Sequence, residues 1–393
     1  MTLADRWLLP EGIEELLPPE AARLEQLRRQ LLDLYRAWGY EQVFPPLIEY
    51  LESLLTGAGN DLALKTFRLT DPLTGRQMGV RADMTPQIAR MDAHSLRQLG
   101  PTRLCYAGHV LHAKPSNLAA SRALIQIGAE LYGHAGVESD TEIVLLMLET
   151  LQCAGLSNVH LDLGHVAIYR ALADQAGLSA DAEWRLFEIF QRKAVPELED
   201  FLRTEVPDIE AQQRFRTLIQ LSGDEQVLET ARTALAGASD AVFLALDELS
   251  RIAATIRQRA PSVVLYFDLG ELRGYHYHTG LVFSAYLPGV GHAVASGGRY
   301  DKIGEVYGRA RPATGFSTDL ARLVKWTALP QSSACRILAP ALEDAALWTQ
   351  ITRLRNEGNI VIQQLPGATS SQLAHGCQLQ LVCVDQEWKV VPL

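Results

Sequence analysis

The stretch that decides the fold reads RLCYAGHVLH over residues 103–112 and SRALIQIGAELY over residues 121–132. Apolar and polar residues alternate in both segments, which predicts two β-strands, Arg103–His112 and Ser121–Tyr132. The residues between them, 113–120, include a proline and an asparagine and are typical of a loop. The sequence therefore predicts a long hairpin here, and the rest of the chain is arranged around it.

The segment that precedes the hairpin begins with a helix and ends in an extended run. Leucine and aromatic residues recur at spacings of three and four over Glu20–Trp38, which predicts an amphipathic helix that ends at Gly39. The run Val43–Ile48 contains Pro45 and Pro46, and proline removes a backbone donor and forbids helix. We therefore expect an edge strand there.

Further elements complete a first domain of residues 1–330. Strand pieces are expected in Thr66–Arg81 around a DPLTG turn, and a helix over Pro86–Leu99. The sequence then becomes rich in leucine, alanine, glutamate and arginine, which predicts a helical insertion at about residues 168–260. Strands resume at Val263–Leu269 with hairpin-like sequence through Gly298, and a helix is expected over Ser317–Trp326.

The last sixty or so residues predict a small α/β unit over 331–393. Its pattern predicts four elements: strand Arg336–Ala339, helix Ala345–Arg355, strand Asn359–Gln364 and strand Leu379–Val384.

Composition and charge narrow the class of protein. The net charge is −10, from 36 basic and 46 acidic residues, and opposes binding to a polyanion, so we expect no nucleic acid as main partner. Without an apolar run of about 20 residues or a signal-like N-terminus, a cytoplasmic protein with no membrane contact is expected. The five cysteines are scattered and never spaced as CxxC, so neither a disulfide framework nor a metal site is indicated, and no cofactor is expected.

Three segments in order resemble the signature motifs of class II aminoacyl-tRNA synthetases of the histidyl type. They are Trp38–Tyr40 through Pro46 and Glu49, then Tyr106–Pro115 with Arg122 and Gln126–Glu130, then Ala313–Arg322. The resemblance implies an α+β fold, an antiparallel sheet flanked by helices, and a dimer interface formed by the first motif. Taken alone, the first motif is equally an ordinary helix, turn and strand.

The resemblance also shows what is missing. His112 stands where that family has an arginine that holds the ATP α-phosphate, because a guanidinium fork neutralises two oxyanions in the transition state. Lys114 replaces a glutamate, Leu124 replaces the aromatic residue under adenine, and Ala321 beside Arg322 replaces another glutamate. We therefore expect no catalytic residues and no ATP chemistry.

Two more segments, LRGYHYHTG at 272–280 and GGRYD at 297–301, resemble motifs of the histidyl enzyme. By this resemblance a histidine-binding pocket is expected. Asp83 and Thr85 would meet the amino group, Gln126 the amino and carboxylate groups, Arg273 the carboxylate, and Glu130 with Tyr277 or His278 the imidazole. Because an arginine left without its anion is costly, histidinol is expected to bind much more weakly. The alternative is that these residues are satisfied remnants of an ancestral site.

A synthetase frame without ATP chemistry and with a short tail resembles the regulatory subunits of short-form ATP phosphoribosyltransferases. That family implies a non-catalytic chain that assembles with the short catalytic subunit into a hetero-octamer, as homodimers, and that enables feedback inhibition of the first step of histidine biosynthesis by L-histidine. Two alternatives remain: a divergent class II synthetase-like enzyme that activates an amino acid, in which His112 or Lys114 binds phosphate, and a tRNA-binding module, which the acidic charge disfavours.

Overall fold

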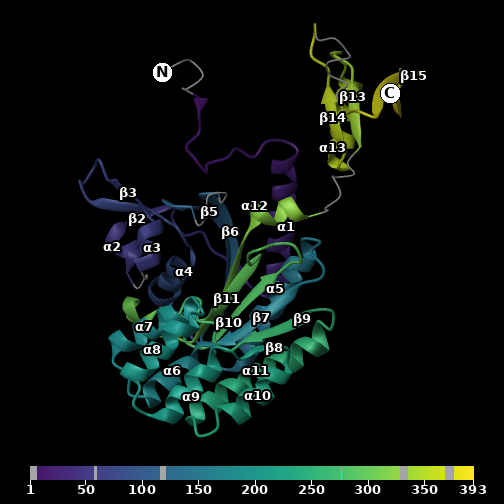
Figure 1. The fold of residues 1–393 in the computed structure, drawn as a ribbon. Helices are drawn as coiled ribbons and strands as arrows, with labels where there is room; N and C mark the ends of the chain where they lie inside the picture. The colour runs from purple at the N-terminus through teal and green to yellow at the C-terminus, as the bar shows by residue number, and fades with distance from the viewer. Residues whose placement is uncertain (1–6, 57–59, 116–120, 276, 328–334, 368–375) are drawn as a thin grey trace. The chain divides into compact units, whose positions relative to one another are not determined.

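The structure is a computed structural model that describes residues 7–56, 60–115, 121–275, 277–327, 335–367 and 376–393. The chain divides into two compact units, Met1–Ala328 and Leu329–Leu393 (Figure 1). The predicted domain boundary at residue 330 and part of the predicted loop, residues 116–120, lie outside the described residues.

The first unit is built on a sheet of nine strands in the order β1-β5-β6-β12-β11-β10-β7-β9-β8. The pairs from β5 to β7 are antiparallel, while β1 joins β5 and β9 joins β7 in parallel. An antiparallel sheet flanked by helices was predicted and is confirmed. The strands are β1 (Glu41–Gln42), β5 (Thr102–Leu111), β6 (Ala123–Tyr132), β7 (His160–His165), β8 (Ser222–Gly223), β9 (Val264–Asp268), β10 (Leu281–Tyr286), β11 (Ala295–Arg299) and β12 (Ala313–Asp319).

Helices outside the insertion that pack with this sheet include α1 (Glu20–Ala37), α5 (Val137–Cys153) and α12 (Leu320–Trp326). α1 turns Leu24, Leu27, Leu31 and Tyr35 inward, as its periodicity predicted. The predicted helix Ser317–Trp326 was wrong in its first turn, because β12 continues to Asp319, whose carboxylate accepts the Ala321 amide as the helix N-cap.

A smaller layer precedes the hairpin. It holds a three-stranded sheet of β2 (Ile48–Tyr50), β4 (Gln77–Val80) and β3 (Phe67–Thr70), with α2 (Leu51–Leu55), α3 (Asn60–Lys65), α4 (Thr85–Arg90) and the π-helix η2 (Met91–Leu96). The single helix predicted over Pro86–Leu99 is therefore α4 followed by a π-helical turn that ends at Arg97 with φ 51°. A buried ion pair of 2.8 Å between Asp92 and Arg311 fixes that turn.

The expected edge strand Val43–Ile48 was wrong in its extent. Only Glu41–Gln42 pairs with β5, and Val43 adds one backbone hydrogen bond of 2.9 Å to the Cys105 carbonyl. Pro45 and Pro46 then interrupt the pairing, because neither has an amide hydrogen to donate. The chain leaves the large sheet there and re-enters extended structure as β2.

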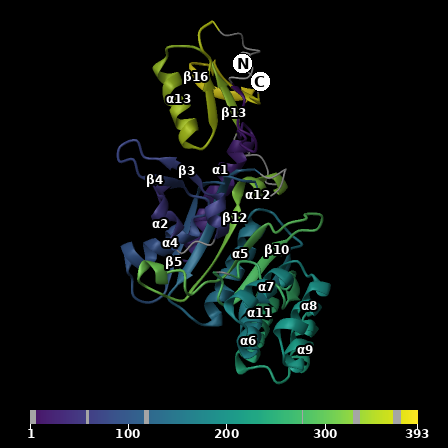
Figure 2. The same ribbon diagram turned by 60° about the vertical axis from the view of Figure 1, so that its left-hand side comes forward.

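The helical insertion lies at one end of the large sheet in both ribbon views (Figure 1, Figure 2). Its helices are α6 (Val166–Gln175), α7 (Ala180–Gln191), α8 (Val195–Glu205), α9 (Ile209–Leu218), α10 (Gln226–Ala234) and α11 (Asp240–Arg259). The rings of Tyr169, Phe190 and Phe215 meet edge to face at 5.3–6.4 Å in its core. The short strand β8, inside this insertion, was not predicted. The described part of the chain contains no helix that is both long and apolar enough to span a bilayer.

In the residues that the structure describes, the second unit has a four-stranded sheet in the order β14-β13-β15-β16 and the helix α13. Its elements are β13 (Arg336–Ala339), α13 (Ala345–Asn356), β14 (Ile360–Gln363), β15 (Leu379–Val384) and β16 (Glu387–Pro392). Strand β16 was not predicted. Its turn places Asp385 and Gln386 at φ of 54° and 64°, a two-residue hairpin turn that the sequence hides because it lacks the usual glycine.

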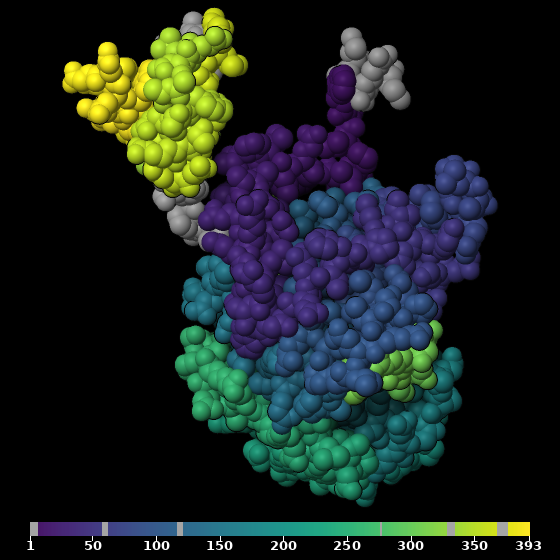
Figure 3. Space-filling model, turned by 180° about the vertical axis from the view of Figure 1, so that it is seen from behind, coloured from purple at the N-terminus to yellow at the C-terminus, as the bar shows by residue number. Residues whose placement is uncertain are grey.

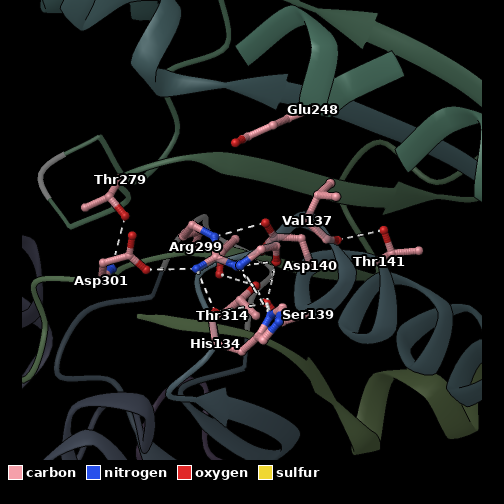
Figure 4. Close-up of polar contacts among 12 residues, drawn as sticks. His134, Val137, Ser139, Asp140, Thr141, Glu248, Thr279, Arg299, Asp301 and Thr314 are labelled. Carbon is pink, nitrogen blue, oxygen red and sulfur yellow. Dashed lines mark hydrogen bonds and ion pairs between the residues drawn. The ribbon is translucent and has the colours of Figure 1, made fainter. Parts of the chain in front are cut away.

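A buried ion pair joins the sheet to α5. Arg299, at the end of β11, donates to Asp140 at 2.9 Å and to Asp301 at 3.0 Å, and the side chains of Arg299 and Asp140 are 7% and 3% exposed (Figure 4). The same guanidinium donates to Ser139 and to two backbone carbonyls. Arg299 thus holds the strand that forms the floor of the cavity described below.

We expect Arg299→Ala to lower the free energy of unfolding by about 3–5 kcal/mol, because the substitution leaves the Asp140 carboxylate buried without its cation. Urea denaturation at pH 7 measures the loss. The control is Arg203→Ala, which removes an exposed pair, 73% and 80% exposed, and should change stability by less than about 1 kcal/mol. Equal losses in the two variants would contradict this account.

Candidate functional site: a carboxylate-lined cavity in the sheet

A cavity of about 110 Å³ opens over β7, β10, β11 and β12, a space well above the roughly 10–15 Å³ that one water needs. Six of the seven residues predicted for histidine binding line it: Asp83, Thr85, Glu130, Arg273, Tyr277 and His278. Gln126 is not among the lining residues. The cavity therefore brings together side chains from positions 83 to 278, which only the sheet makes neighbours.

Glu130 is the deepest of these groups, with 1% of its surface exposed. One carboxylate oxygen accepts hydrogen bonds from Tyr106 at 2.9 Å and from Thr85 at 3.0 Å. The other oxygen is buried and has no hydrogen-bond partner, and the same is true of the Tyr300 hydroxyl. A side chain at Gly315 would overlap both atoms, so the absence of a Cβ there leaves room for them.

The electrostatics of Glu130 favour a cationic or hydrogen-donating ligand. Burial raises the pKa of Glu130 well above its usual value, although the hydrogen bonds from Tyr106 and Thr85 oppose that rise. Unpaired buried polar atoms are rare in folded proteins, because each costs free energy that a hydrogen bond would offset. A donor bound between Glu130 and Tyr300 would remove that cost.

Asp83, Thr85 and Gln126 form a small network at the end of β6. Gln126 donates to Asp83 at 2.7 Å and accepts the Met84 amide at 2.9 Å, and the Thr85 amide donates to Asp83 at 3.0 Å. The amide of Gln126 is used to hold the segment that carries Asp83. In this structure Gln126 orients a pocket residue and does not itself face the cavity.

The loop Leu272–Gly280 supplies the other wall. Gly274 has φ +67°, and a Cβ there would crowd Tyr277 and His278, so the turn requires glycine. His278 is 7% exposed, and its Nδ1 lies 3.1 Å from the Arg273 carbonyl. Burial lowers the pKa of His278 to about 4, so the ring is neutral at pH 7. His276, in the same motif, lies outside the described residues.

Arg273 is already paired within the chain. Its guanidinium donates to Glu271 at 3.0 Å, to Tyr286 at 2.8 Å and to Ser284 at 3.2 Å, and its side chain is 53% exposed. When a ligand without a carboxylate binds, Arg273 would therefore still be partly exposed and still be paired within the chain. We expected histidinol to bind much more weakly than histidine because Arg273 would be left unpaired. Since Arg273 is paired within the chain, the expected difference in affinity is smaller.

Three acidic residues of the cavity were missed by sequence reasoning: Asp162, Asp268 and Glu271. Burial, and then the neighbouring carboxylates of Asp268 and Glu271, raise the pKa of Asp162 to about 6. The sequence gives only a weak indication that these residues belong to a site. Asp162 is a single acidic residue inside an apolar strand, and Asp268 is the last residue of another strand. The described lining residues include five acidic side chains and one guanidinium. Glu271 pairs with Arg273 and Asp268 pairs with Lys193, so the remaining acidic groups favour a cation over a phosphate.

In the region that resembles the ATP-handling motif, His112 and two arginines contact acceptors of the chain itself. His112 lies 3.0 Å from the Ala82 carbonyl, and burial lowers the pKa of its imidazole. Arg122 donates to the carbonyls of His112 and Glu11, and Arg322 pairs with Asp319 at 3.3 Å. Lys114 is exposed, and Leu124 packs against the apolar core.

Comparison with known proteins places this fold in one class. Residues 12–323 match the family model for histidyl-tRNA synthetase. The histidyl-tRNA synthetase of Nostoc sp. PCC 7120 superposes with a TM-score of 0.79 at 19% identity over 98% of this chain and 97% of that one, which shows the fold. The first unit thus has the class II fold of the histidyl-tRNA synthetases.

The particular family follows from the whole chain. Residues 334–391 match the model for the C-terminal domain of the ATP phosphoribosyltransferase subunit HisZ. Proteins named ATP phosphoribosyltransferase regulatory subunit from Stutzerimonas stutzeri and Thioalkalivibrio sulfidiphilus are 56% and 57% identical, each over 100% of both chains. A structure described as an ATP phosphoribosyltransferase regulatory subunit/histidyl-tRNA synthetase from Bacillus halodurans has a TM-score of 0.84 at 27% identity, covering 95% and 97%. The chain belongs to the family of ATP phosphoribosyltransferase regulatory subunits, as the motifs predicted.

Two titratable groups of the cavity should tilt the pH dependence of stability in opposite directions. Between pH 6.5 and about 4 the unfolded chain protonates His278 and the folded chain does not, so stability falls as pH falls. Between pH 3.8 and about 6 the folded chain keeps the Asp162 proton and the unfolded chain loses it, so stability falls as pH rises.

Urea unfolding between pH 4 and 7 tests this with His278→Asn and Asp162→Asn. Relative to wild type, His278→Asn should gain about 2–3 kcal/mol as pH falls through this range, and Asp162→Asn should gain about 1–2 kcal/mol as pH rises from 4 to 6, with the smaller figure allowing for solvent screening. Profiles that stay parallel to wild type would show that these groups titrate normally.

Proposed function

We propose that the cavity binds L-histidine and that the chain is a non-catalytic subunit that makes a short-form ATP phosphoribosyltransferase responsive to histidine. The observation that carries the proposal is the pair of buried, unpaired atoms, the Glu130 carboxylate oxygen and the Tyr300 hydroxyl, that face one cavity. An imidazole has a ring nitrogen that donates and one that accepts, which suits a carboxylate beside a hydroxyl.

The remaining lining residues suit the rest of a histidine molecule. The Asp83 carboxylate, held by Gln126 and the Thr85 amide, suits the ligand's ammonium group. Arg273 suits the carboxylate, after exchanging part of its contact with Glu271. The five carboxylates of the lining make the ammonium the stronger recognition element, because they surround a single guanidinium.

The absence of catalysis is supported by the state of the motif 2 region. Adenylate formation needs a fixed cation at the α-phosphate, and His112 is a neutral ring directed at a backbone carbonyl. Arg122 and Arg322 contact acceptors of the chain itself, and Lys114 is an exposed side chain. The acidic cavity beside them would repel the triphosphate.

We further propose that the chain forms homodimers within a hetero-octamer containing the short catalytic subunit, in the cytoplasm. The apolar face of α1 is buried in its own chain, so the expected interface moves to the segment that follows β1. Phe44, Leu47 and Ile48 are 74%, 45% and 41% exposed there. Figure 3 shows the face on which the N-terminal segments, in purple, are exposed.

Calorimetric titration should show that the chain binds histidine, that histidinol binds about tenfold more weakly, and that 3-(imidazolyl)propionate, which lacks the ammonium group, binds at least a hundredfold more weakly. The order follows from five carboxylates and one already paired guanidinium in the lining. Glu130→Gln keeps the acceptor for Tyr106 and Thr85 and replaces the unpaired oxygen by an amide nitrogen that cannot accept from the ligand, so it should weaken histidine binding by about 2 kcal/mol, or about 30-fold.

The matched control for Glu130→Gln is Glu229→Gln, which makes the same change in a side chain that is 80% exposed on α10 and should bind histidine like wild type. If 3-(imidazolyl)propionate bound as tightly as histidine, the ammonium group would not face these carboxylates. Unchanged binding by Glu130→Gln would place histidine outside this cavity.

The purified chain should show no histidine-dependent exchange of pyrophosphate into ATP, because losing one transition-state donor typically costs about 3–4 kcal/mol and the motif 2 arginine is replaced by His112. An active histidyl-tRNA synthetase assayed in parallel is the control. Exchange above background that depends on histidine would identify the chain as a divergent amino-acid-activating enzyme.

A further inference from the structure

The loop Leu272–Gly280, which forms one wall of the cavity, contacts the helical insertion through Tyr275. This side chain is 7% exposed. Its hydroxyl donates to the Glu183 carboxylate on α7, and its carbonyl accepts from Arg170 on α6 at 2.5 Å. The Arg170 guanidinium also lies 4.5 Å from the centre of the Tyr275 ring. The ring stacks on Phe187 at 5.1 Å and 25° and meets Tyr169 edge to face at 5.3 Å. We call these four partners of Tyr275 the tyrosine box.

The loop on either side of Tyr275 forms the cavity wall. Arg273 precedes it by two residues, Tyr277 follows by two, and both line the cavity. The His278 ring lies against the Arg273 carbonyl and meets the Tyr277 ring edge to face at 4.3 Å. Backbone hydrogen bonds from Tyr275 to Leu272 and from Tyr277 and His278 to Gly274 shape the loop itself, and the tyrosine box holds that shaped loop against the helical insertion.

The contacts continue from the tyrosine box to the surface of α7. Trp184 lies 5.5 Å from Phe187 with a tilt of 41° and is 43% exposed. On the same helix, Arg185 pairs with Glu205 of α8 at 3.0 Å. A displacement of α7 would therefore shift Phe187 and Glu183 together, and with them two of the contacts of Tyr275.

We propose that Tyr275 is a positioning residue through which the helical insertion sets the affinity of the cavity for histidine. This inference rests on the proposed histidine binding. Tyr275 does not line the cavity, so it acts through Arg273, Tyr277 and His278. By thermodynamic reciprocity, any partner that binds α7 and shifts the tyrosine box changes histidine affinity by the same factor by which histidine changes the partner's affinity.

The first arm of the test uses the full-length chain without ligand and follows amide hydrogen exchange in residues 272–280. Tyr275→Phe and Glu183→Gln each keep the packing of the box and weaken the hydroxyl–carboxylate bond, and Tyr275→Leu also removes the stacking. Exchange in the loop should rise about tenfold in the first two variants and more in the third. Tyr266→Phe, on β9, and Glu188→Gln, on the exposed face of α7, are the matched controls and should exchange like wild type.

The second arm adds histidine to the same variants. Calorimetry should give a dissociation constant raised about tenfold for Glu183→Gln and Tyr275→Phe, and more for Tyr275→Leu. In wild type, histidine should slow exchange in residues 180–191 of α7 and change the emission of Trp184, identified by its loss in Trp184→Phe. Both effects should be lost in Tyr275→Leu at saturating histidine, a result that merely weaker packing would not give.

The outcomes separate the two ideas. If wild type and variants bind histidine with the same dissociation constant, or if loop exchange is unchanged, the positioning role of Tyr275 is overturned while the histidine site stands. If wild type binds no histidine, the proposed function fails, and coupling through Tyr275 to histidine fails with it. Tighter histidine binding by Tyr275→Phe than by Tyr275→Leu would support a contribution of ring stacking to the position of the loop.

Discussion

The pairing register of β5, β6 and β12 is the constraint on which both the core and the site depend. Glu130 lies opposite Leu104 on one side and Gly315 on the other. Because side chains alternate along a strand, a slip of one residue would turn Glu130 away from Tyr106 and the cavity and would bring apolar core residues into it. The register is fixed by the apolar face of the hairpin, so the same burial that stabilises the sheet also places a carboxylate where it is costly.

The free-energy cost of burying the Glu130 carboxyl group differs from the cost of burying a charge that serves the structure alone. The Arg299–Asp140 pair shows how this chain treats buried charge that serves structure, because each partner is neutralised and hydrogen-bonded. Other buried residues, Asp140 among them, also keep a polar atom without a hydrogen-bond partner, but Glu130 and Tyr300 both line the cavity. A small ligand bound there can recover the stability that their unpaired atoms cost.

The synthetase frame and its chemistry have separate physical requirements. Holding an amino acid needs hydrogen bonds and an acidic wall, which this cavity has. Activating one needs free cations at the phosphates, and here His112, Arg122 and Arg322 are directed at acceptors of the chain itself. A fold that recognises its ligand without consuming it can respond to ligand concentration, because binding then only shifts the balance between states.

The sequence alone determined the hairpin, the helical insertion and the family, because alternation, helical spacing and motif order are local or linear features. It also named six of the residues that line the cavity. Only the tertiary structure decided that Gln126 supports Asp83, that Arg273 is paired with Glu271, and that Asp162 and Asp268 face the same space. Strand β16 and the π-helical end of α4 were likewise invisible in the sequence. The partner of each of these side chains depends on which distant segments of the backbone lie side by side. Its neighbours in the sequence do not determine that.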